Sequence, residues 1–357
     1  MKEHDFIKRR GAQHQVSNRF SLHSHELRDD FLNYCALEDE EATNSKTSLI
    51  DTFPKTIVNK VKSPDVGLEY SLNPYQGCEH GCVYCYARNS HEYWGYGAGL
   101  DFEQKILVKR NAPELLEAKL KSKKWKAAPI VLSANTDCYQ PIEKKLGITR
   151  KLLELFLKYK HPVAIITKNA LVQRDLDILS ELAGDNLVNV NISITSLEEK
   201  TRRILEPRTA SIKKRLQTVE KLHKNGVPVR VMMAPIIPSI NSHEILPLVK
   251  AVAECGASSV GHTIVRLNGA IGEVFSTWIR KAMPDKAEKV LHQIAECHGG
   301  TLNDSRFGTR MRGEGNIADQ IHQQFKIAKK LYLKNQERAP LNCDLHEQFK
   351  DGQMRLF

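Results

Sequence analysis

The sequence has no apolar run near the roughly 18 residues that a membrane-spanning helix needs, and its opening, MKEHDFIKRR, has no apolar stretch behind its charges. We therefore expect no membrane span and no secretory signal, and we expect the protein in the cytoplasm. The sequence also lacks internal repeats and a disulfide framework. Three of its eight cysteines fall within Cys78 to Cys85 and the others are isolated. In a reducing compartment such a cluster is typical of metal ligation.

The composition excludes a collagen-like or wholly disordered chain, because 41% hydrophobic and 27% charged residues are ordinary globular usage. A length of 357 residues allows two domains or one barrel-like α/β unit. The 53 Lys and Arg against 42 Asp and Glu give a net charge of +11. That charge permits attraction to phosphate-rich partners, but many basic enzymes carry as much.

The chain divides into four parts by residue composition and by the pattern of apolar residues. Residues 1–66 are polar and predict an N-terminal arm with little regular structure, 67–270 an alternating core, 271–335 a C-terminal helical extension and 336–357 a flexible tail. The predicted strands are Glu69–Asn73, Ile130–Ala134, Val163–Thr167, Val188–Ile194, Val229–Ala234 and Ser259–Val265. The predicted helices are Ala112–Lys121, Ile148–Tyr159, Val172–Leu182, Ile212–Asn225, His243–Cys255, Glu273–Met283, Asp285–Cys297 and Ile317–Leu333.

Six successive βα units predict an α/β fold with a parallel sheet. Eight units would close a full barrel, so six right-handed crossovers predict a partial (βα)6 TIM-type barrel. In such a fold the functional site lies where the strands end.

The cysteines follow the first predicted strand in the pattern C-x3-C-x2-C, at Cys78, Cys82 and Cys85. A closed structural zinc site needs four ligands, and His80 or His91 could complete one. A [4Fe-4S] cluster held by three thiolates would instead leave one iron open to a small molecule.

This spacing after the first strand of a βα series resembles the radical S-adenosylmethionine (SAM) superfamily. Further motifs are similar to a branch related to spore photoproduct lyase and described as DNA-repair photolyase-like. These motifs are Asn73-Pro74-Tyr75-x-Gly77-Cys78, Ser133-x-Asn135-Thr136-Asp137-x-Tyr139-Gln140-Pro141-Ile142-Glu143, Thr167-Lys168, Ser193-Ile194 and Glu206-Pro207-Arg208, with an Arg-Gly-Ala sequence from Arg10. The resemblance implies that an open iron binds SAM and that one electron, from a donor, yields methionine and a 5′-deoxyadenosyl radical that abstracts hydrogen from a substrate.

The resemblance also implies roles for single residues. Tyr84 is expected against the adenine of SAM, and Lys168 and Ser193 at its carboxylate and ribose. Polar side chains at the end of the second strand suit the methionine ammonium, although an Asx-type turn would use the same residue types; they are Ser133, Asn135, Thr136 and Asp137.

Two residues are candidates for the radical step itself. Tyr86 directly follows the third cysteine, where the resemblance to the lyase implies a tyrosine that takes part in radical transfer. Alternatively, Tyr86 packs under the loop. The lyase returns a hydrogen atom from a cysteine in the loop after strand two, where this sequence has Ala134 and Asn135. Cys138 lies nearby, as a candidate hydrogen donor or a small apolar filler.

Two segments suggest further partners. Between Lys200 and Lys224 nine Lys or Arg stand against two Glu, which suits a phosphate backbone or a solvated helix face. The end of the chain, Gln353 to Phe357, resembles the short peptide with which bacterial repair proteins bind the sliding clamp.

The leading hypothesis is a radical SAM enzyme acting on nucleic acid, possibly damaged DNA. The alternatives are a radical SAM enzyme acting on a peptide or small metabolite, and a non-catalytic zinc-binding nucleic-acid module.

Overall fold

The structure, a computed structural model, describes residues 6–20, 46–333 and 340–350. Its strands are β1 (Ser48–Thr52), β2 (Val58–Lys60), β3 (Tyr70–Leu72), β4 (Tyr75–Gln76), β5 (Lys105–Lys109), β6 (Ile130–Leu132), β7 (Val163–Thr167), β8 (Val188–Ser193), β9 (Val229–Ile236) and β10 (Val260–Ile264). Its helices are η1 (Tyr86–Trp94), α2 (Leu100–Gln104), α3 (Ala112–Lys121), α4 (Glu143–Leu146), α5 (Ile148–Lys158), η2 (Ala170–Asp175), α6 (Leu176–Gly184), α7 (Glu199–Leu205), α8 (Ile212–Lys224), η3 (Ser242–Glu244), α9 (Ile245–Glu254), α10 (Ile271–Ala282), α11 (Pro284–Glu296), α12 (Gly315–Tyr332) and α13 (Asp344–Lys350).

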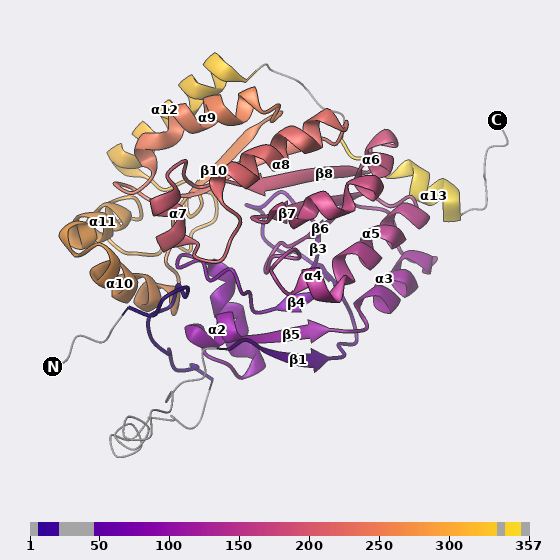
Figure 1. Cartoon of the computed structure of the whole chain (residues 1–357), viewed down its shortest axis with the longest axis horizontal. Coiled ribbons are helices and arrows are strands. Elements are labelled where there is room, and N and C mark those ends of the chain that lie inside the picture. Colours follow the sequence, from indigo (N-terminus) through magenta and orange to yellow (C-terminus); the bar gives the residue numbers. More distant parts are fainter. Residues whose placement is uncertain (1–5, 21–45, 334–339, 351–357) are drawn as a thin grey trace.

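The main sheet has seven strands in the order β10-β9-β8-β7-β6-β3-β2 (Figure 1). The six strands predicted from the sequence all pair in parallel with their neighbours in chain order, and β2 adds an antiparallel edge. The sheet stays open among the described residues, because β10 and β2 end it without pairing to each other. The predicted α/β partial barrel is confirmed.

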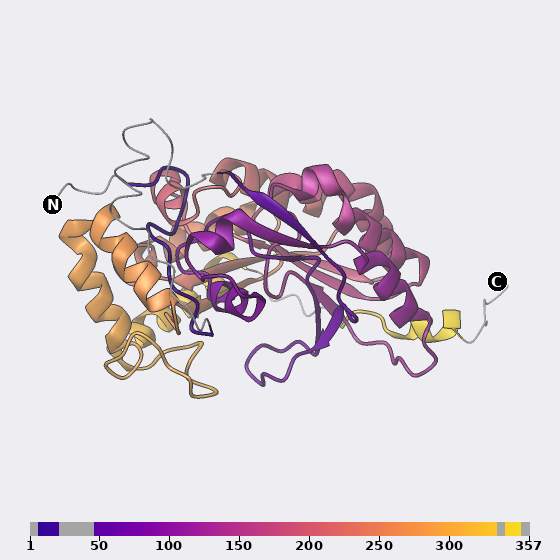
Figure 2. The same ribbon diagram turned by 90° about the horizontal axis from the view of Figure 1, so that it is seen from below.

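The helices follow local rules of the sequence. Helix α8 begins after Ser211, whose hydroxyl accepts a hydrogen bond from the Lys214 amide at 3.4 Å, and it ends before Gly226, whose φ is 73°. The helices predicted at Val172–Leu182 and His243–Cys255 both open with a 3-10 turn, η2 and η3. Helices α10 and α11 lie together at one end of the molecule, away from α13 at the other (Figure 2).

The N-terminal arm contains structure that the sequence did not predict. Strand β1 pairs in parallel with β5, which also pairs with β4, so these three strands form a second, small sheet. Closer to the N-terminus, Ala12 and Val16 are buried against Val274 of α10. Among the described residues of the arm, β1 and β2 are the regular structure that the sequence did not predict.

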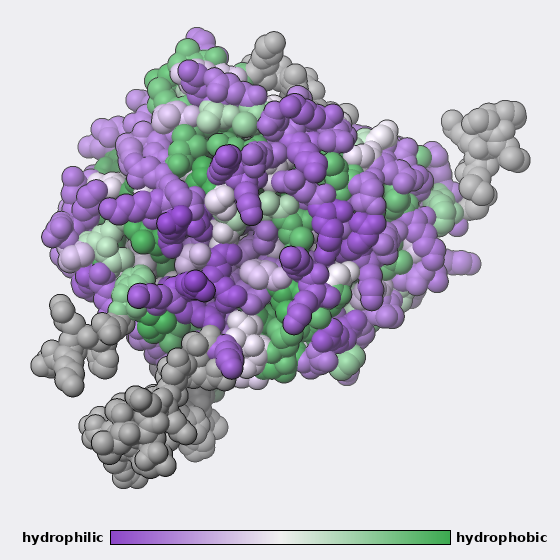
Figure 3. All heavy atoms as spheres, in the orientation of Figure 1, coloured by the Kyte–Doolittle hydropathy of each residue, from purple (hydrophilic) through white to green (hydrophobic). Residues whose placement is uncertain are grey.

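The surface seen in Figure 3 carries mostly hydrophilic residues, with smaller apolar areas between them. Within the part of the chain that the structure describes, no helix combines the length and the hydropathy that crossing a membrane would require.

Candidate functional site

The three clustered cysteines lie in the loop that joins β4 to η1. Cys78 and Cys82 are buried and Cys85 is partly exposed. The loop turns at Gly77, with a φ of 83°, and at Gly81, with a φ of 67°. A Cβ atom at Gly77 would lie 2.8 Å from the Lys105 carbonyl oxygen, so the loop packs against β5 at a distance that only glycine permits.

Two other loops hold the cysteine loop in place. The amide oxygen of buried Gln140 accepts from the Glu79 amide at 2.9 Å, and its Nε2 donates to the Gly77 carbonyl at 3.2 Å. On the other side, Arg208 donates to the Glu79 carboxylate at 3.0 Å, and the Val83 amide donates to the Leu205 carbonyl at 3.1 Å. The motifs around Gln140 and Glu206–Arg208 therefore serve the cysteine loop directly.

The donor set of this loop fits an iron–sulfur cluster. Three thiols on one short loop can ligate three irons of a [4Fe-4S] cluster, and the Lys168 ammonium lies close enough to influence both Cys82 and Cys85. Burial and the Glu206 carboxylate raise the pKa of the Cys82 thiol, and Lys168 opposes that shift. In the described ranges no three His, Cys, Asp or Glu side chains are placed so that they could hold a single metal ion.

Beside the cysteines lies a buried charged cluster built on Glu206. Arg215 donates to the Glu206 carboxylate at 2.5 Å and to the Ser193 carbonyl at 2.9 Å. Thr195 and the Tyr84 hydroxyl also donate to Glu206. Burial raises the pKa of Glu206, but the charges of Arg215 and Lys168 outweigh it and lower the pKa to about 2. Glu206 is therefore a fixed anion within the fold.

Lys168 follows the end of β7, and its ammonium lies 5.9 Å from the centre of the Tyr84 ring. Burial lowers the pKa of Lys168, whereas Cys82 and Glu206 raise it, and the net shift is upward. Lys168, Tyr84 and buried Ser193, all predicted cofactor residues, thus lie around Glu206 and the cysteines. The structure brings these three together.

The loop after β6 is held to the end of β7 and to the cysteine loop by the carboxylate of Asp137. Asp137 accepts from the Thr167 hydroxyl at 2.8 Å, the Lys168 amide at 2.8 Å and the Tyr139 amide at 2.9 Å, and it lies 3.3 Å from His80 Nδ1. Burial lowers the pKa of His80, but the charges of Asp137 and Cys78 raise it to about 9. The Asx turn considered for Asp137 is present, and its carboxylate joins the ends of β6 and β7.

The other predicted residues of this loop also have partners in the chain. The Ser133 hydroxyl accepts from the Cys138 amide at 2.7 Å, and Ser133 has a φ of 69°, which is unusual for a residue with a Cβ atom. The Asn135 side chain donates to Ser90 at 2.9 Å, and the Thr136 hydroxyl donates to the Tyr75 carbonyl at 2.5 Å. These contacts fix the loop beside the cysteine loop.

The two candidates for the radical step differ in location. Tyr86 is 56% exposed at the start of η1, and its hydroxyl donates to the Ala134 carbonyl. Cys138 is fully buried in the main hydrophobic core, with its carbonyl accepting from Thr149 at 2.6 Å. Tyr86 therefore lies at the open side of the β6 loop and Cys138 beneath it.

The basic block divides into buried and exposed residues. Arg202 and Arg215 are buried and pair with Glu199 and Glu206, so they belong to the fold. The exposed members are Lys200, Arg203, Lys213, Lys214, Lys221 and Lys224.

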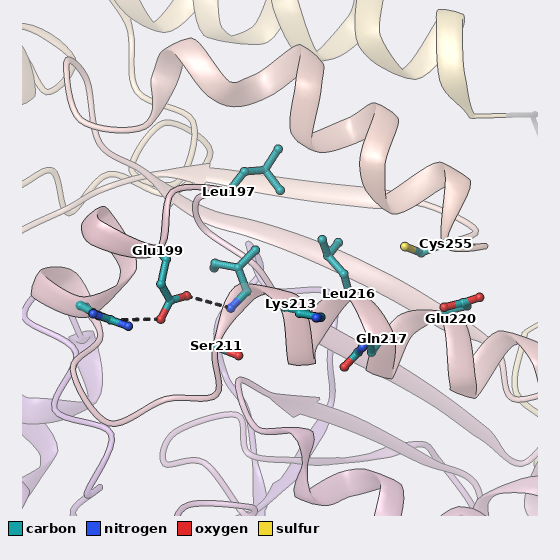
Figure 4. Close-up of a pocket in the computed structure, with 10 residues that line it drawn as sticks. Leu197, Glu199, Ser211, Lys213, Leu216, Gln217, Glu220 and Cys255 are labelled. Carbon is teal, nitrogen blue, oxygen red and sulfur yellow. Dashed lines mark hydrogen bonds and ion pairs between the residues drawn. The ribbon is translucent and has the colours of Figure 1, made fainter.

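A hollow of about 630 Å³ lies between Leu197, Leu216 and Cys255, and none of its lining residues belongs to the cysteine loop (Figure 4). Arg203 and Lys213, both exposed, are among the residues that line this hollow.

Sequence reasoning missed Arg88 and Glu103, which form a fully buried pair at 2.5 Å next to the cysteine loop. Neither belongs to a recognisable motif. The Arg-Gly-Ala sequence at Arg10 was the available hint, since the backbone amides of Gly11 and Ala12 both donate to Glu103. The predicted clamp peptide, Gln353 to Phe357, lies outside the described residues.

Comparisons with known proteins agree on the fold. A family model described as the Radical SAM superfamily matches residues 72–252, about half of the chain. A protein of Mycobacterium tuberculosis named only as uncharacterised is 30% identical over 234 residues, which cover 65% of this chain and 69% of that protein. Another, from Methanocaldococcus jannaschii, is 33% identical over 198 residues, covering 55% and 71%. The radical SAM Nalpha-GlyT isomerase of Pseudomonas phage M6 is 25% identical over 196 residues, covering 54% and 38%.

Among solved structures, spore photoproduct lyase complexed with dinucleoside spore photoproduct has a TM-score of 0.58 at 16% sequence identity. The match covers 80% of this chain and 79% of the lyase chain. At this identity the likeness concerns the fold, which the two chains share through most of their length.

Proposed function

The chain belongs to the radical SAM superfamily, and from this we propose that it is an enzyme that uses a [4Fe-4S] cluster on Cys78, Cys82 and Cys85, together with SAM, to act on nucleic acid. The observation that carries the proposal is the three-thiol loop beside Lys168 and Glu206 at the strand ends. When bound and reduced, the cluster supplies the electron that converts SAM to methionine and a 5′-deoxyadenosyl radical.

Each residue of the pocket has a proposed task. The Lys168 ammonium supplies the positive charge for a carboxylate of SAM, because a charge-assisted hydrogen bond is about twice as strong as a neutral one. Glu206 accepts a hydrogen bond from the Tyr84 hydroxyl and so keeps the ring in place for its proposed contact with the adenine. Asp137 holds the Lys168 backbone, and the Ser193 side chain lies at the end of β8 for the ribose.

Tyr86 is the better of the two proposed catalytic residues. Its ring is half exposed, whereas the Cys138 thiol is buried in the core and has no open side toward a substrate. We propose that the Tyr86 hydroxyl gives a hydrogen atom to the product radical and recovers one from 5′-deoxyadenosine, and that Cys138 packs the loop. The proposed hydrogen donor is therefore a tyrosine, whereas the lyase uses a cysteine thiol in the loop after strand two.

Three observations support a nucleic-acid substrate. Helices α7 and α8 carry exposed Lys and Arg side chains, and such cations bind a phosphate backbone. Near η1, the guanidinium of Arg19 lies 4.7 Å from the Phe20 ring centre and 5.6 Å from that of Tyr93, both exposed rings, and bases stack on such surfaces. The chain is similar in fold to spore photoproduct lyase, whose structure was solved in complex with dinucleoside spore photoproduct. A target base would be unpaired or flipped, since the cysteine loop is buried.

The first experiment tests the reaction class. The protein is purified without oxygen, reconstituted with iron and sulfide, reduced, and assayed with SAM for 5′-deoxyadenosine. Cys82→Ala should abolish the product, whereas Cys297→Ala, which changes a buried cysteine outside the loop, should retain it. Zinc at one equivalent without iron or acid-labile sulfide would contradict the proposal and favour a zinc-binding module.

The second experiment tests the substrate class. Binding of labelled single- and double-stranded DNA is measured at two salt concentrations, and binding should weaken steeply as salt rises. Absent or salt-insensitive binding would favour a peptide or small metabolite as the substrate.

We further propose that Gln353 to Phe357 binds the sliding clamp, in which case deleting these residues should abolish co-purification with purified clamp.

A further inference from the structure

The segment Arg10–Ala12 lies directly on the cysteine loop. A Cβ atom at Gly11 would lie 1.8 Å from the Gly81 carbonyl oxygen, and a Cβ atom at Gly81 would lie 2.7 Å from Oε2 of Glu103. Backbone from the N-terminal arm, backbone from the cysteine loop and the Glu103 carboxylate therefore meet with no room for a methyl group.

Glu103 joins these segments. Its carboxylate accepts from the Gly11 amide at 3.1 Å and from the Ala12 amide at 2.8 Å, and its backbone carbonyl accepts from Arg10 at 3.0 Å. The Glu103 side chain is fully buried, so water does not compete for these hydrogen bonds.

Arg88 extends this contact to the second cysteine. Its Nε donates to the Cys82 carbonyl at 3.0 Å, and its Nη2 donates to Glu103 at 2.5 Å. The remaining nitrogen donates to the Ala98 and Gly99 carbonyls at 3.2 and 3.0 Å. A fully buried cation thus lies against the loop that carries Cys82, and the Glu103 carboxylate compensates its charge.

We propose that Glu103 is a positioning residue that ties the N-terminal segment to the cysteine loop and, by compensating Arg88, sets the reduction potential of the cluster. The inference rests on the proposed function, in that Cys78, Cys82 and Cys85 hold a [4Fe-4S] cluster. Reduction adds one negative charge to the cluster, and nearby charge and hydrogen bonding tune the potential of such a centre. With the carboxylate neutralised, the uncompensated Arg88 cation favours the reduced cluster.

The test is a redox titration of the reconstituted protein, followed by the EPR signal of the reduced cluster. Glu103→Gln should move the midpoint to more positive potential and Arg88→Met to more negative potential. Each change should be about tenfold in the ratio of reduced to oxidised cluster, or about 59 mV for a one-electron couple. Glu273→Gln is the matched control, because Glu273 contacts the same segment through His14 at 2.8 Å but is 60% exposed, and it should not shift the midpoint.

Opposite shifts are the decisive result, because loss of structure alone would disturb both variants in the same direction. Shifts of the same sign, or no shift in Glu103→Gln at normal iron content, would overturn the inference. If Glu103→Gln holds no cluster, Gly11→Ala decides, since it leaves every charge in place but displaces the segment from Gly81. It should lose iron to a chelator several times faster than Gly184→Ala, whose Cβ atom would meet nothing within 4 Å; equal rates would overturn the inference.

Failure of this inference is distinguishable from failure of the proposed function. A wild-type protein that takes up no iron and sulfide would refute both. A wild-type cluster with midpoints that do not respond to Glu103 and Arg88 would refute the inference alone.

Discussion

Replacing Glu206 by Gln should destabilise the apo-protein by about 3 kcal/mol at pH 7. The pKa of Glu206 falls from its ordinary value of 4.5 to about 2, and at about 1.4 kcal/mol per pKa unit this difference is worth about 3 kcal/mol. Removing one partner of a buried ion pair independently costs about 3 to 5 kcal/mol, because Arg215 would remain buried without its carboxylate.

The pH dependence has a definite sign. Since the pKa of Glu206 is lower in the folded protein than in the unfolded chain, its contribution is complete above pH 4.5 and is lost as the pH falls toward 2. The difference in stability between wild type and Glu206→Gln should therefore be constant from pH 7 to about pH 5 and shrink below that.

Urea unfolding of the apo-protein, followed by the fluorescence of its three tryptophans, measures this difference. Glu199→Gln is the matched control, because Glu199 also pairs with an arginine but its side chain is 36% exposed, and it should cost less than about 1 kcal/mol. Adding Arg215→Met to Glu206→Gln should recover part of the loss. A loss below about 1 kcal/mol at pH 7, or one that persists unchanged at pH 3, would refute the reasoning.

Three further predictions concern the cofactors and the substrate. Gly81→Ala should lower the iron content after reconstitution, because the new Cβ atom would lie 2.7 Å from Glu103 at a φ of 67°, whereas Gly184→Ala should match wild type; equal iron in both would contradict the packing argument. Lys168→Met should weaken SAM binding about tenfold or more in equilibrium dialysis, and an unchanged affinity would exclude the proposed carboxylate contact. Arg203→Glu with Lys213→Glu should weaken DNA binding and reduce its salt slope, and a slope equal to wild type would place the phosphate backbone elsewhere.

The main sheet could be predicted from the sequence because its strands are rich in Val and Ile, and because buried residues alternate with less buried ones along β7 and β8. Val163–Thr167 and Ala112–Lys121 agree with the structure to the residue. Strand β1 could not be predicted in this way, since it is an edge strand with mostly exposed side chains and no apolar period. Its partner β5 is buried and also pairs with β4, but β1 is a strand only through its pairing with β5, across more than fifty residues of chain.

The site was predictable where chemistry fixes the spacing of residues along the chain. The three cysteines and Lys168 belong to motifs, and the structure places them at one edge of the sheet. The partners of Asp137 were not predictable, because its carboxylate is committed to β7 and His80 by contacts between distant segments. Arg88 and Glu103 carry no pattern at all, since a single buried ion pair leaves no period in a sequence.

The docking of the Arg10–Ala12 segment has a consequence for the order in which the chain assembles. Ala12 and Val16 pack against Val274, and the Gly11 amide binds Glu103, so the earliest described residues depend on partners made much later in synthesis. Contacts between such distant positions form late, because a long stretch of chain must close before they are made. Ala12 and Val16 can therefore reach their final place only after Val274 has been made, whereas the Gly11 contact with the cysteine loop needs the chain only as far as Glu103.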